Sequence, residues 1–532
     1  MPPRTAQQEM AGTGNSTPIP APVGGMNTRD GLMMLKPEEA RLLQNWLPDL
    51  GGCVVRPGYE VSCVVGGGST ADTTFITADI TTVRASTAFK SITVSGTIPI
   101  IATLRSATQP KFLASCAGGL FDITGSVASR RVSAGTYHSD LWVTECFNGY
   151  MFGVNGTDTP WRYNGTTVGA TGFSGSGLTL SNLQTVTMVK GRLWFTEVDS
   201  ADVWYGPSAG VTGALTKFQL SQIVQGGKCV GIGSWSYEGG GGPLDQTVFI
   251  MDTGEVLIYS GDPATTFAKV GTFHSPAPVG LNSWVKIGGE LIIITANGPI
   301  PISFIYRGIA FDLTQLQVWG KVSPSWQKDY QIAKSYNGFF GYYCGGILYF
   351  NMPISASSSK QYVLNTRIPA WTIYTNLPVA SMADDSGVLY FGGGDGPYIY
   401  RHASKSDNGN QIIALARQAF SYPMGKNLSV MWTLFRPNIE TTSTASGQFQ
   451  VDVDYGTDEI TSSVVELSAI ATGASWGDPW GSAWSGAPIV QKQFLGVSGY
   501  GCAVAPVAQV YSSSGDVTWY SSDVVGVRGG IL

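Results

Sequence analysis

The sequence predicts an almost entirely β-structured protein, built around a β-propeller of six to eight blades. Of its 532 residues 69 are glycine, and it contains 15 Trp, 23 Tyr and 22 Phe. Aromatic residues favour strands and glycine favours tight turns, so this composition indicates short strands joined by turns. Hydrophobic residues make up 43% of the chain, enough to bury a large core.

A repeated hairpin is the second observation that predicts the propeller. Each unit consists of two runs of aromatic and β-branched residues, separated by a polar or glycine-containing turn. The units recur at intervals close to the length of one four-stranded blade. Stacked sandwiches remain an alternative, because the same alternation permits them. The seven units are 111–114 with 119–123, 150–154 with 160–163, 192–195 with 202–205, 247–250 with 255–259, 290–294, 347–350 with 361–364, and 388–391 with 398–400.

Four segments are expected along the chain. Residues 1–26 are polar and rich in Pro and Gly, which predicts a flexible N-terminal arm. Residues 27–60 form a docking segment with one short helix over 37–47, where Pro37 suits the first turn and acidic residues follow it. Residues 61–430 form the propeller. Residues 431–532 form a C-terminal β-sandwich or platform, because 448–455 alternates strictly between apolar and polar residues.

Charge and cysteine content exclude several classes of protein. The formal net charge is −5 with no cluster of Lys and Arg, so a basic groove that grips nucleic acid is not expected. No apolar run is long enough to span a membrane. The seven dispersed cysteines contain no CxxC motif, which favours reduced, buried side chains over a disulfide framework or a zinc site.

No catalytic, metal or cofactor site is predicted, and we expect a protein that is not an enzyme. Acidic residues occur together at Asp384-Asp385, which we interpret as part of a turn. A second group, Asp452, Asp454, Asp458 and Glu459, is interpreted as a solvated strand face. The run at Asp452 lacks the closing Glu of a calcium loop. The glycines at 239–242 lack the Lys and Ser/Thr of a phosphate-binding loop. A structural role is therefore favoured.

A set of short motifs, in a fixed order, resembles the tail hub or nozzle proteins of short-tailed double-stranded DNA phages. The N-terminal part of the set is Asn27-Thr28-Arg29-Asp30-Gly31-Leu32, Lys36-Pro37-Glu38-Glu39-Ala40, Asn45-Trp46-Leu47-Pro48 and Val55-Arg56-Pro57-Gly58-Tyr59. Further motifs occur at 154–160, 190–195, 254–256, 288–291, 362–366, 390–393 and 418–422, so the resemblance covers about 27–440.

This resemblance implies a structural virion protein, made in the cytoplasm of the host bacterium and located in the tail. Such proteins assemble as a homohexameric ring of propeller subunits below the adaptor ring. The ring closes and then conducts the channel for DNA ejection, and it also contacts tail fibres or spikes. Double-stranded DNA passes without specific binding, which agrees with the acidic balance of the chain. Candidate interface residues are Trp46, Arg56, Trp476, Trp480 and Trp484.

Two other functions remain open at the level of sequence. A carbohydrate-binding or glycoside-hydrolysing propeller would stack sugars on Trp480 and Trp484 and use Asp384 or Asp452 as acid or base. The Asp-box pattern of sialidase-like blades is missing. A general interaction propeller is the third possibility, although the Gly-His and Trp-Asp signatures of such blades are absent.

Overall fold

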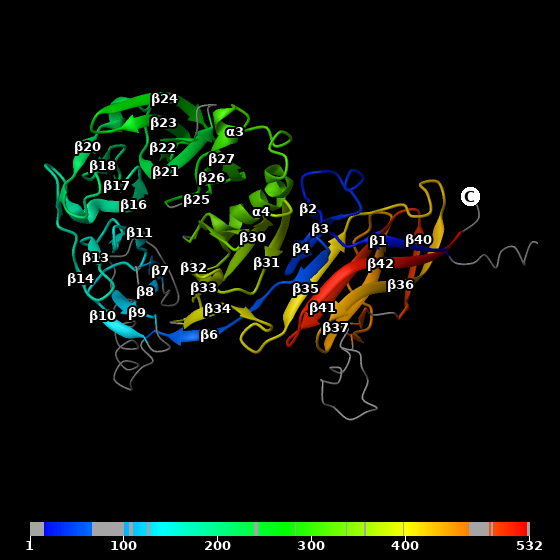
Figure 1. The fold of residues 1–532 in the computed structure, drawn as a ribbon. Helices are drawn as coiled ribbons and strands as arrows, with labels where there is room; N and C mark the ends of the chain where they lie inside the picture. Colours follow the sequence, from blue (N-terminus) through cyan, green and yellow to red (C-terminus); the bar gives the residue numbers. More distant parts are fainter. Residues whose placement is uncertain are drawn as a thin grey trace, which may run out of the picture. The chain divides into compact units, whose positions relative to one another are not determined.

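The computed structural model describes two compact units that share one chain (Figure 1). The described residues are 15–65, 100–105, 110–124, 128–238, 243–281, 283–336, 338–355, 358–396, 398–467, 489–490 and 493–528. We call residues 61–361 and 376–402 the propeller unit, and residues 1–60, 362–375 and 403–532 the sandwich unit. Each unit is thus assembled from segments far apart in the sequence.

The propeller unit contains seven successive blade sheets within the described residues, numbered here in chain order. Blade 1 has β7 (Ile100–Arg105), β8 (Pro110–Cys116), β9 (Gly119–Asp122) and β10 (Ser129–Val132). Blade 2 has β11 (Val143–Phe147), β12 (Tyr150–Val154), β13 (Trp161–Tyr163) and β14 (Val168–Ala170). Blade 3 has β16 (Leu183–Val189), β17 (Arg192–Glu197), β18 (Val203–Tyr205) and β20 (Thr216–Phe218). The short strands β15 (Phe173–Ser174) and β19 (Gly213–Ala214) pair beside blade 3.

Blades 4 to 7 follow along the chain. Blade 4 has β21 (Cys229–Glu238), β22 (Pro243–Met251), β23 (Glu255–Asp262) and β24 (Thr266–His274). Blade 5 has β25 (Trp284–Ile287), β26 (Glu290–Thr295) and β27 (Gly298–Pro301). Blade 6 has β28 (Phe340–Cys344), β29 (Ile347–Pro353) and the start of β30 (Ser359–Asn365). Blade 7 has β32 (Val379–Asp385), β33 (Val388–Gly393) and β34 (Tyr398–Ser404), and β6 (Gly58–Val64) completes its sheet.

The first strands of the blades form a closed ring. In chain order β7, β11, β16, β21, β25, β28 and β32 each contact the next, and β32 contacts β7. The seam is closed by a hydrophobic cluster in which Phe112 and Ala114 of blade 1 pack with Cys63, Ala383 and Ile399 of blade 7. The seven predicted hairpins coincide with the middle strands of these blades, so the predicted propeller is confirmed.

Helices are few in the described part of the chain. The helices α3 (Ile302–Tyr306) and α4 (Ser323–Ala333), with three short 3-10 turns at Leu180–Asn182, Leu220–Gln222 and Trp319–Val322, lie in the propeller unit. Trp326 of α4 is fully buried, and its indole N–H donates to the backbone oxygen of Thr295 at 3.0 Å. The α4 sequence carries Pro324 in its first turn and apolar residues at helical spacing, a signal that the sequence analysis missed. No helix among the described residues is long and apolar enough to cross a membrane.

The sandwich unit has two sheets. One contains β1 (Asn15–Pro20), β4 (Trp46–Asp49), β5 (Gly52–Val55), β36 (Val430–Thr441), β39 (Ile489–Val490), β40 (Leu495–Gly501) and β42 (Val517–Arg528). The other contains β2 (Gly25–Met26), β3 (Glu39–Gln44), β31 (Ala370–Tyr374), β35 (Ile412–Gln418), β37 (Ala445–Val453), β38 (Val465–Leu467) and β41 (Val504–Ser512). The rings of Phe435 on β36 and Phe449 on β37 stack at 6.0 Å between the two sheets.

Two predictions for the N-terminal region and two predicted domain boundaries were wrong. Residues 15–20 and 25–26 of the predicted arm are strands, and β1 pairs with β42. The predicted helix over 37–47 is the strands β3 and β4, because β3 pairs with β35, β31 and β2 and this pairing overrides local helix propensity. Asn45, between the two strands, has a φ of 58°, which an α-helix does not accommodate. The sandwich also includes 15–60 and 362–375, beyond the predicted 431–532, and the propeller ends at 402 instead of 430.

A buried arginine holds the sandwich unit together near the points where the chain leaves it. Arg56 is fully buried, and its guanidinium pairs with Asp407 through contacts of 2.8 Å and 2.6 Å. Its other N–H groups donate to Asn45 Oδ1 at 2.8 Å and to the backbone oxygens of Pro57 and Thr375, each at 2.9 Å. All five donors of the guanidinium are therefore used, which is the condition under which a buried charge is tolerated.

Two acidic side chains, one buried and one partly buried, connect blades 1 and 2. Asp122 of blade 1 accepts a hydrogen bond from Tyr163 of blade 2 at 2.9 Å. Asp140, in the loop between the blades, accepts from the hydroxyl of Ser115 at 2.5 Å and from the backbone N–H of Gly118 at 3.0 Å. Burial raises the pKa of Asp140 to about 6, although these hydrogen bonds oppose the shift.

Replacing Arg56 with Met should destabilise the sandwich unit strongly, because Asp407 is left buried without its partner. We expect a loss of about 3–5 kcal/mol in the free energy of unfolding, measured by urea denaturation. The matched control is Lys405→Met, which removes a salt bridge to Asp516 at half-exposed side chains in the same unit. That change should cost about 1 kcal/mol or less. Equal losses for the two variants would show that the Arg56 network is not specially important.

Asp140 should make stability depend on pH. Its ordinary pKa is about 3.9, and the folded value is about 6. The folded state therefore binds its proton more tightly, and this contribution is present below about pH 4 and lost as the pH rises through 6. Between pH 4 and 7.5 the unfolding free energy of the wild type should fall by about 2–3 kcal/mol relative to Asp140→Asn. The exposed Asp199→Asn serves as control, and an identical pH profile for Asp140→Asn and wild type would contradict the prediction.

Candidate functional site: apolar surfaces of the sandwich unit

The predicted interface residues do not form a surface in the described part of the chain. Trp46 is fully buried and packs on Trp519 with ring centroids 5.8 Å apart, and Arg56 is buried in its ion pair with Asp407. Both residues stabilise the interior of the sandwich unit, so their assignment to an interface was wrong. Trp476, Trp480 and Trp484 lie outside the described residues.

The acidic residues considered for catalysis lie in separate units. Asp384 accepts a hydrogen bond from the Tyr342 hydroxyl at 2.8 Å in the propeller unit. Asp452 is completely buried in the sandwich unit, where Arg41 at 2.7 Å and Arg417 at 2.8 Å bind the same carboxylate oxygen. It was expected on a solvated strand face, so the strict alternation of 448–455 did not reveal its burial. Among the described residues no group of three or more His, Cys, Asp or Glu side chains could hold a metal ion.

The outer face of one sandwich sheet carries a row of exposed apolar side chains. Met431 on β36 lies opposite Tyr500 on β40 and Val527 on β42, so the three side chains share one face. Met431 is 55% exposed and Tyr500 is 54% exposed. Leu434 and Val525 form the next pair along the same strands. We call Met431, Leu434, Tyr500, Val525 and Val527 the sheet face.

The other face of the same sheet packs on the core, so apolar residues are expected there and not on the solvent-facing side. Val430, Trp432 and Phe435 of β36 are buried in the core, as expected for a sheet with one solvated side. On the solvated side polar residues are the rule, and contiguous apolar residues there indicate a contact surface. Next to the sheet face Arg436 Nε binds Asp523 at 2.8 Å. An apolar centre beside an Arg-containing polar rim is the usual anatomy of a protein–protein interface.

A second exposed apolar surface lies on the loop after β2. Met33 and Met34 are 74% and 77% exposed, and Leu32 beside them is also exposed. We call these three residues the methionine loop. Methionine is common on surfaces that bind other proteins, because its flexible thioether adapts to a partner.

The methionine loop is held by the residues of the N-terminal signature. The buried Asn27 side chain donates to Asp30 at 2.8 Å and to the buried carboxylate of Glu39 at 3.2 Å. Glu39 also accepts from the backbone N–H of Lys36 at 3.1 Å, and Arg29 binds Asp30 at 2.8 Å. The base of the loop is therefore cross-linked by hydrogen bonds, while its tip presents apolar side chains.

Sequence reasoning identified the segment that contains the methionine loop but not the surfaces themselves. Leu32 and Met34 lie in or beside the signature motifs, yet exposure is decided by the scaffold of Asn27 and Glu39. The sheet face was missed because its residues come from three strands that are adjacent only after folding. Its one sequence signal is Met431, which follows buried Val430 and precedes buried Trp432 in a strand.

Of the seven cysteines, all are free, and five are buried as expected. Cys146 is exposed and Cys502 is partly exposed, so the expectation of burial was wrong for these two.

Comparisons with known proteins complete the description. No protein-family profile matches the chain, and no curated protein matches it. Among solved structures it is similar to BBS1N in its complex with ARL6DN, with a TM-score of 0.36 and 12% identity over 59% of this chain and 94% of the other. The WD40 β-propeller domain of Doa1 gives a TM-score of 0.35 and 10% identity over 65% and 96%. The computationally designed Ika8 protein gives 0.34 and 9% over 56% and 83%.

Proposed function

We propose that this chain is a structural subunit of a short phage tail, which assembles as a homohexameric ring below the adaptor ring. In this role the ring closes the DNA channel and then conducts the DNA during ejection. The chain would act through contact surfaces, with no chemistry of its own. It would be made in the cytoplasm of the host bacterium and reside in the virion tail, in contact with tail fibres or spikes.

The observation that carries the proposal is the construction of the methionine loop. The motif residues Asn27, Asp30 and Glu39, which underlie the resemblance to tail hub proteins, are the same residues that cross-link the base of this loop. These residues form a hydrogen-bonded base that holds two exposed methionines at the tip of the loop, and apolar side chains exposed together suit contact with a partner. We propose that the methionine loop is the surface that binds the adaptor ring.

The sheet face supports self-assembly. Met431, Tyr500 and Val527 form an apolar row on adjacent strands, and such a row suits burial against another copy of the chain. The net charge of −5 supports passage of DNA without specific binding, because like charge disfavours contact with phosphates.

Charged substitutions on the sheet face should weaken assembly. In the double variant with Met431→Asp and Val527→Asp, association of two copies through the sheet face would bury two carboxylates. The dissociation constant for self-association should therefore rise at least tenfold. Light scattering after size exclusion and electron microscopy would report the size of the particle. Val270→Asp is the matched control, since Val270 is a similarly exposed apolar residue on β24 of the propeller unit. A wild type that stays monomeric, alone and with the adaptor ring, would overturn the proposed ring.

The methionine loop should govern docking on the adaptor. Replacing Met33 and Met34 with Ser removes apolar contact area, and affinity for the isolated adaptor ring should fall about tenfold or more. Ile332→Ser, at an exposed position of α4, is the control and should leave docking unchanged. Binding can be followed by biolayer interferometry with the adaptor immobilised. Unchanged affinity in the Met33 and Met34 variant would assign docking to another surface while leaving the oligomer test unaffected.

A further inference from the structure

A small cavity lies between blades 1 and 2 of the propeller unit. Leu113, Ala114, Ser115 and Leu120 line it from blade 1, and Trp142, Thr144 and Trp161 line it from blade 2 and the segment that leads into it. The centre of a water molecule can move within about 10 Å³ of this cavity. That is close to the ~10–15 Å³ that one water molecule requires.

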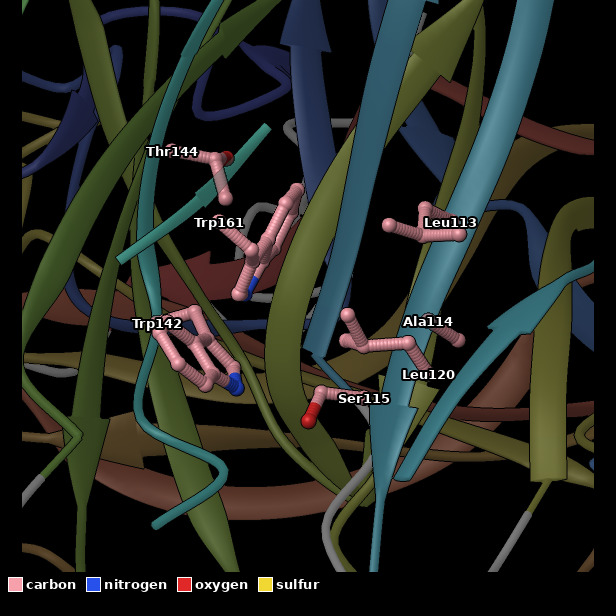
Figure 2. Close-up of a pocket in the computed structure, with 7 residues that line it drawn as sticks. All are labelled: Leu113, Ala114, Ser115, Leu120, Trp142, Thr144 and Trp161. Carbon is pink, nitrogen blue, oxygen red and sulfur yellow. The ribbon is translucent and has the colours of Figure 1, made fainter. Parts of the chain in front are cut away.

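Two of the lining side chains carry an indole N–H group that has no hydrogen-bond partner among the described residues. They are Nε1 of Trp142 and Nε1 of Trp161, and both side chains are at least nine-tenths buried, with exposures of 5% and 2%. The rings lie edge to face with centroids 5.5 Å apart. Figure 2 shows the two rings on one side of the cavity, with the Trp142 nitrogen directed towards the Ser115 hydroxyl. Buried donors without a partner are unfavourable for the folded state.

The chemistry of the wall selects the occupant. Two N–H donors without partners on the lining side chains call for a hydrogen-bond acceptor, which excludes a metal cation and disfavours an apolar guest. A small anion is disfavoured because Asp140 lies behind Ser115, with its carboxylate 2.5 Å from the Ser115 hydroxyl. The hydroxyl of Ser115 adds an oxygen atom that can accept a hydrogen bond. The occupant therefore has to accept hydrogen bonds from the indole N–H groups and to donate one to a hydroxyl oxygen.

We propose that this cavity binds one ordered water molecule, which accepts from the indole N–H groups of Trp142 and Trp161 and donates to the Ser115 hydroxyl oxygen. The water would join the Ser115–Asp140 hydrogen bond of blade 1 to the two tryptophans of blade 2. It would thus extend the polar link between these blades beyond the contact of Asp122 with Tyr163.

A high-resolution crystal structure of the full chain tests the proposal directly. We expect one isolated density peak at about 2.7–3.2 Å from both indole nitrogens. A second measurement uses deuterated protein with ¹⁵N-labelled tryptophan, in which the indole N–H groups of Trp142 and Trp161 should show cross-relaxation with water. Trp142→Phe and Trp161→Phe assign the two signals, and each should reduce the water signal of the remaining indole.

Trp326 provides the internal control, because its indole N–H is buried and already bonded to Thr295, so it should show no contact with water. Absence of density in the cavity, or xenon binding there under pressure, would show a dry cavity and overturn the proposal. A peak refined as chloride, with anomalous signal at long wavelength, would overturn it in favour of an anion. The wild-type measurements stand even if the Phe variants fail to fold.

Discussion

The buried guanidinium of Arg56 is the interaction on which the organisation of this chain depends. The chain passes between the two units after residues 60, 361, 375 and 402. Arg56 binds Pro57, Thr375 and Asp407, which lie close to three of these four points. A sandwich built from three separate segments needs a bond that holds the segments in register. Arginine suits this task, because its planar fork satisfies five acceptors while the charge stays paired with Asp407.

The propeller, too, is closed by segments that are distant from each other in the sequence. The strand β6 precedes blade 1 in the sequence but completes the sheet of blade 7. The hydrophobic cluster at this seam adds Cys63 of β6 to Phe112 of blade 1. Because β6 continues directly from Arg56 through Tyr59, the ring closure and the arginine network are consecutive in the chain. Both units thus obtain their closing element from the N-terminal sixty or so residues.

The proposed function relates this construction to assembly. The residues that sequence reasoning selected as interface candidates, Trp46 and Arg56, are internal supports, whereas the exposed apolar groups lie a few residues away on the methionine loop. A short motif can therefore mark a region of contact without containing the contacting side chains. The motif residues Asn27 and Glu39 are buried and polar, so their role is to set the conformation from which Met33 and Met34 project.

The sequence by itself determined the repeated hairpins, because alternation between apolar runs and turns is a local property that each blade shows independently. It also determined a β-strand over most of 448–455, which ends at Val453 in the structure, and the preference for burial of most cysteines. Tertiary structure alone decided that 39–44 is a strand, since its neighbours β35 and β31 come from residues more than 300 positions away. Long-range pairing likewise placed Asp452 between Arg41 and Arg417 and brought Met431, Tyr500 and Val527 onto one face. The physical reason is that burial and exposure depend on partners, and those partners are distant in the sequence.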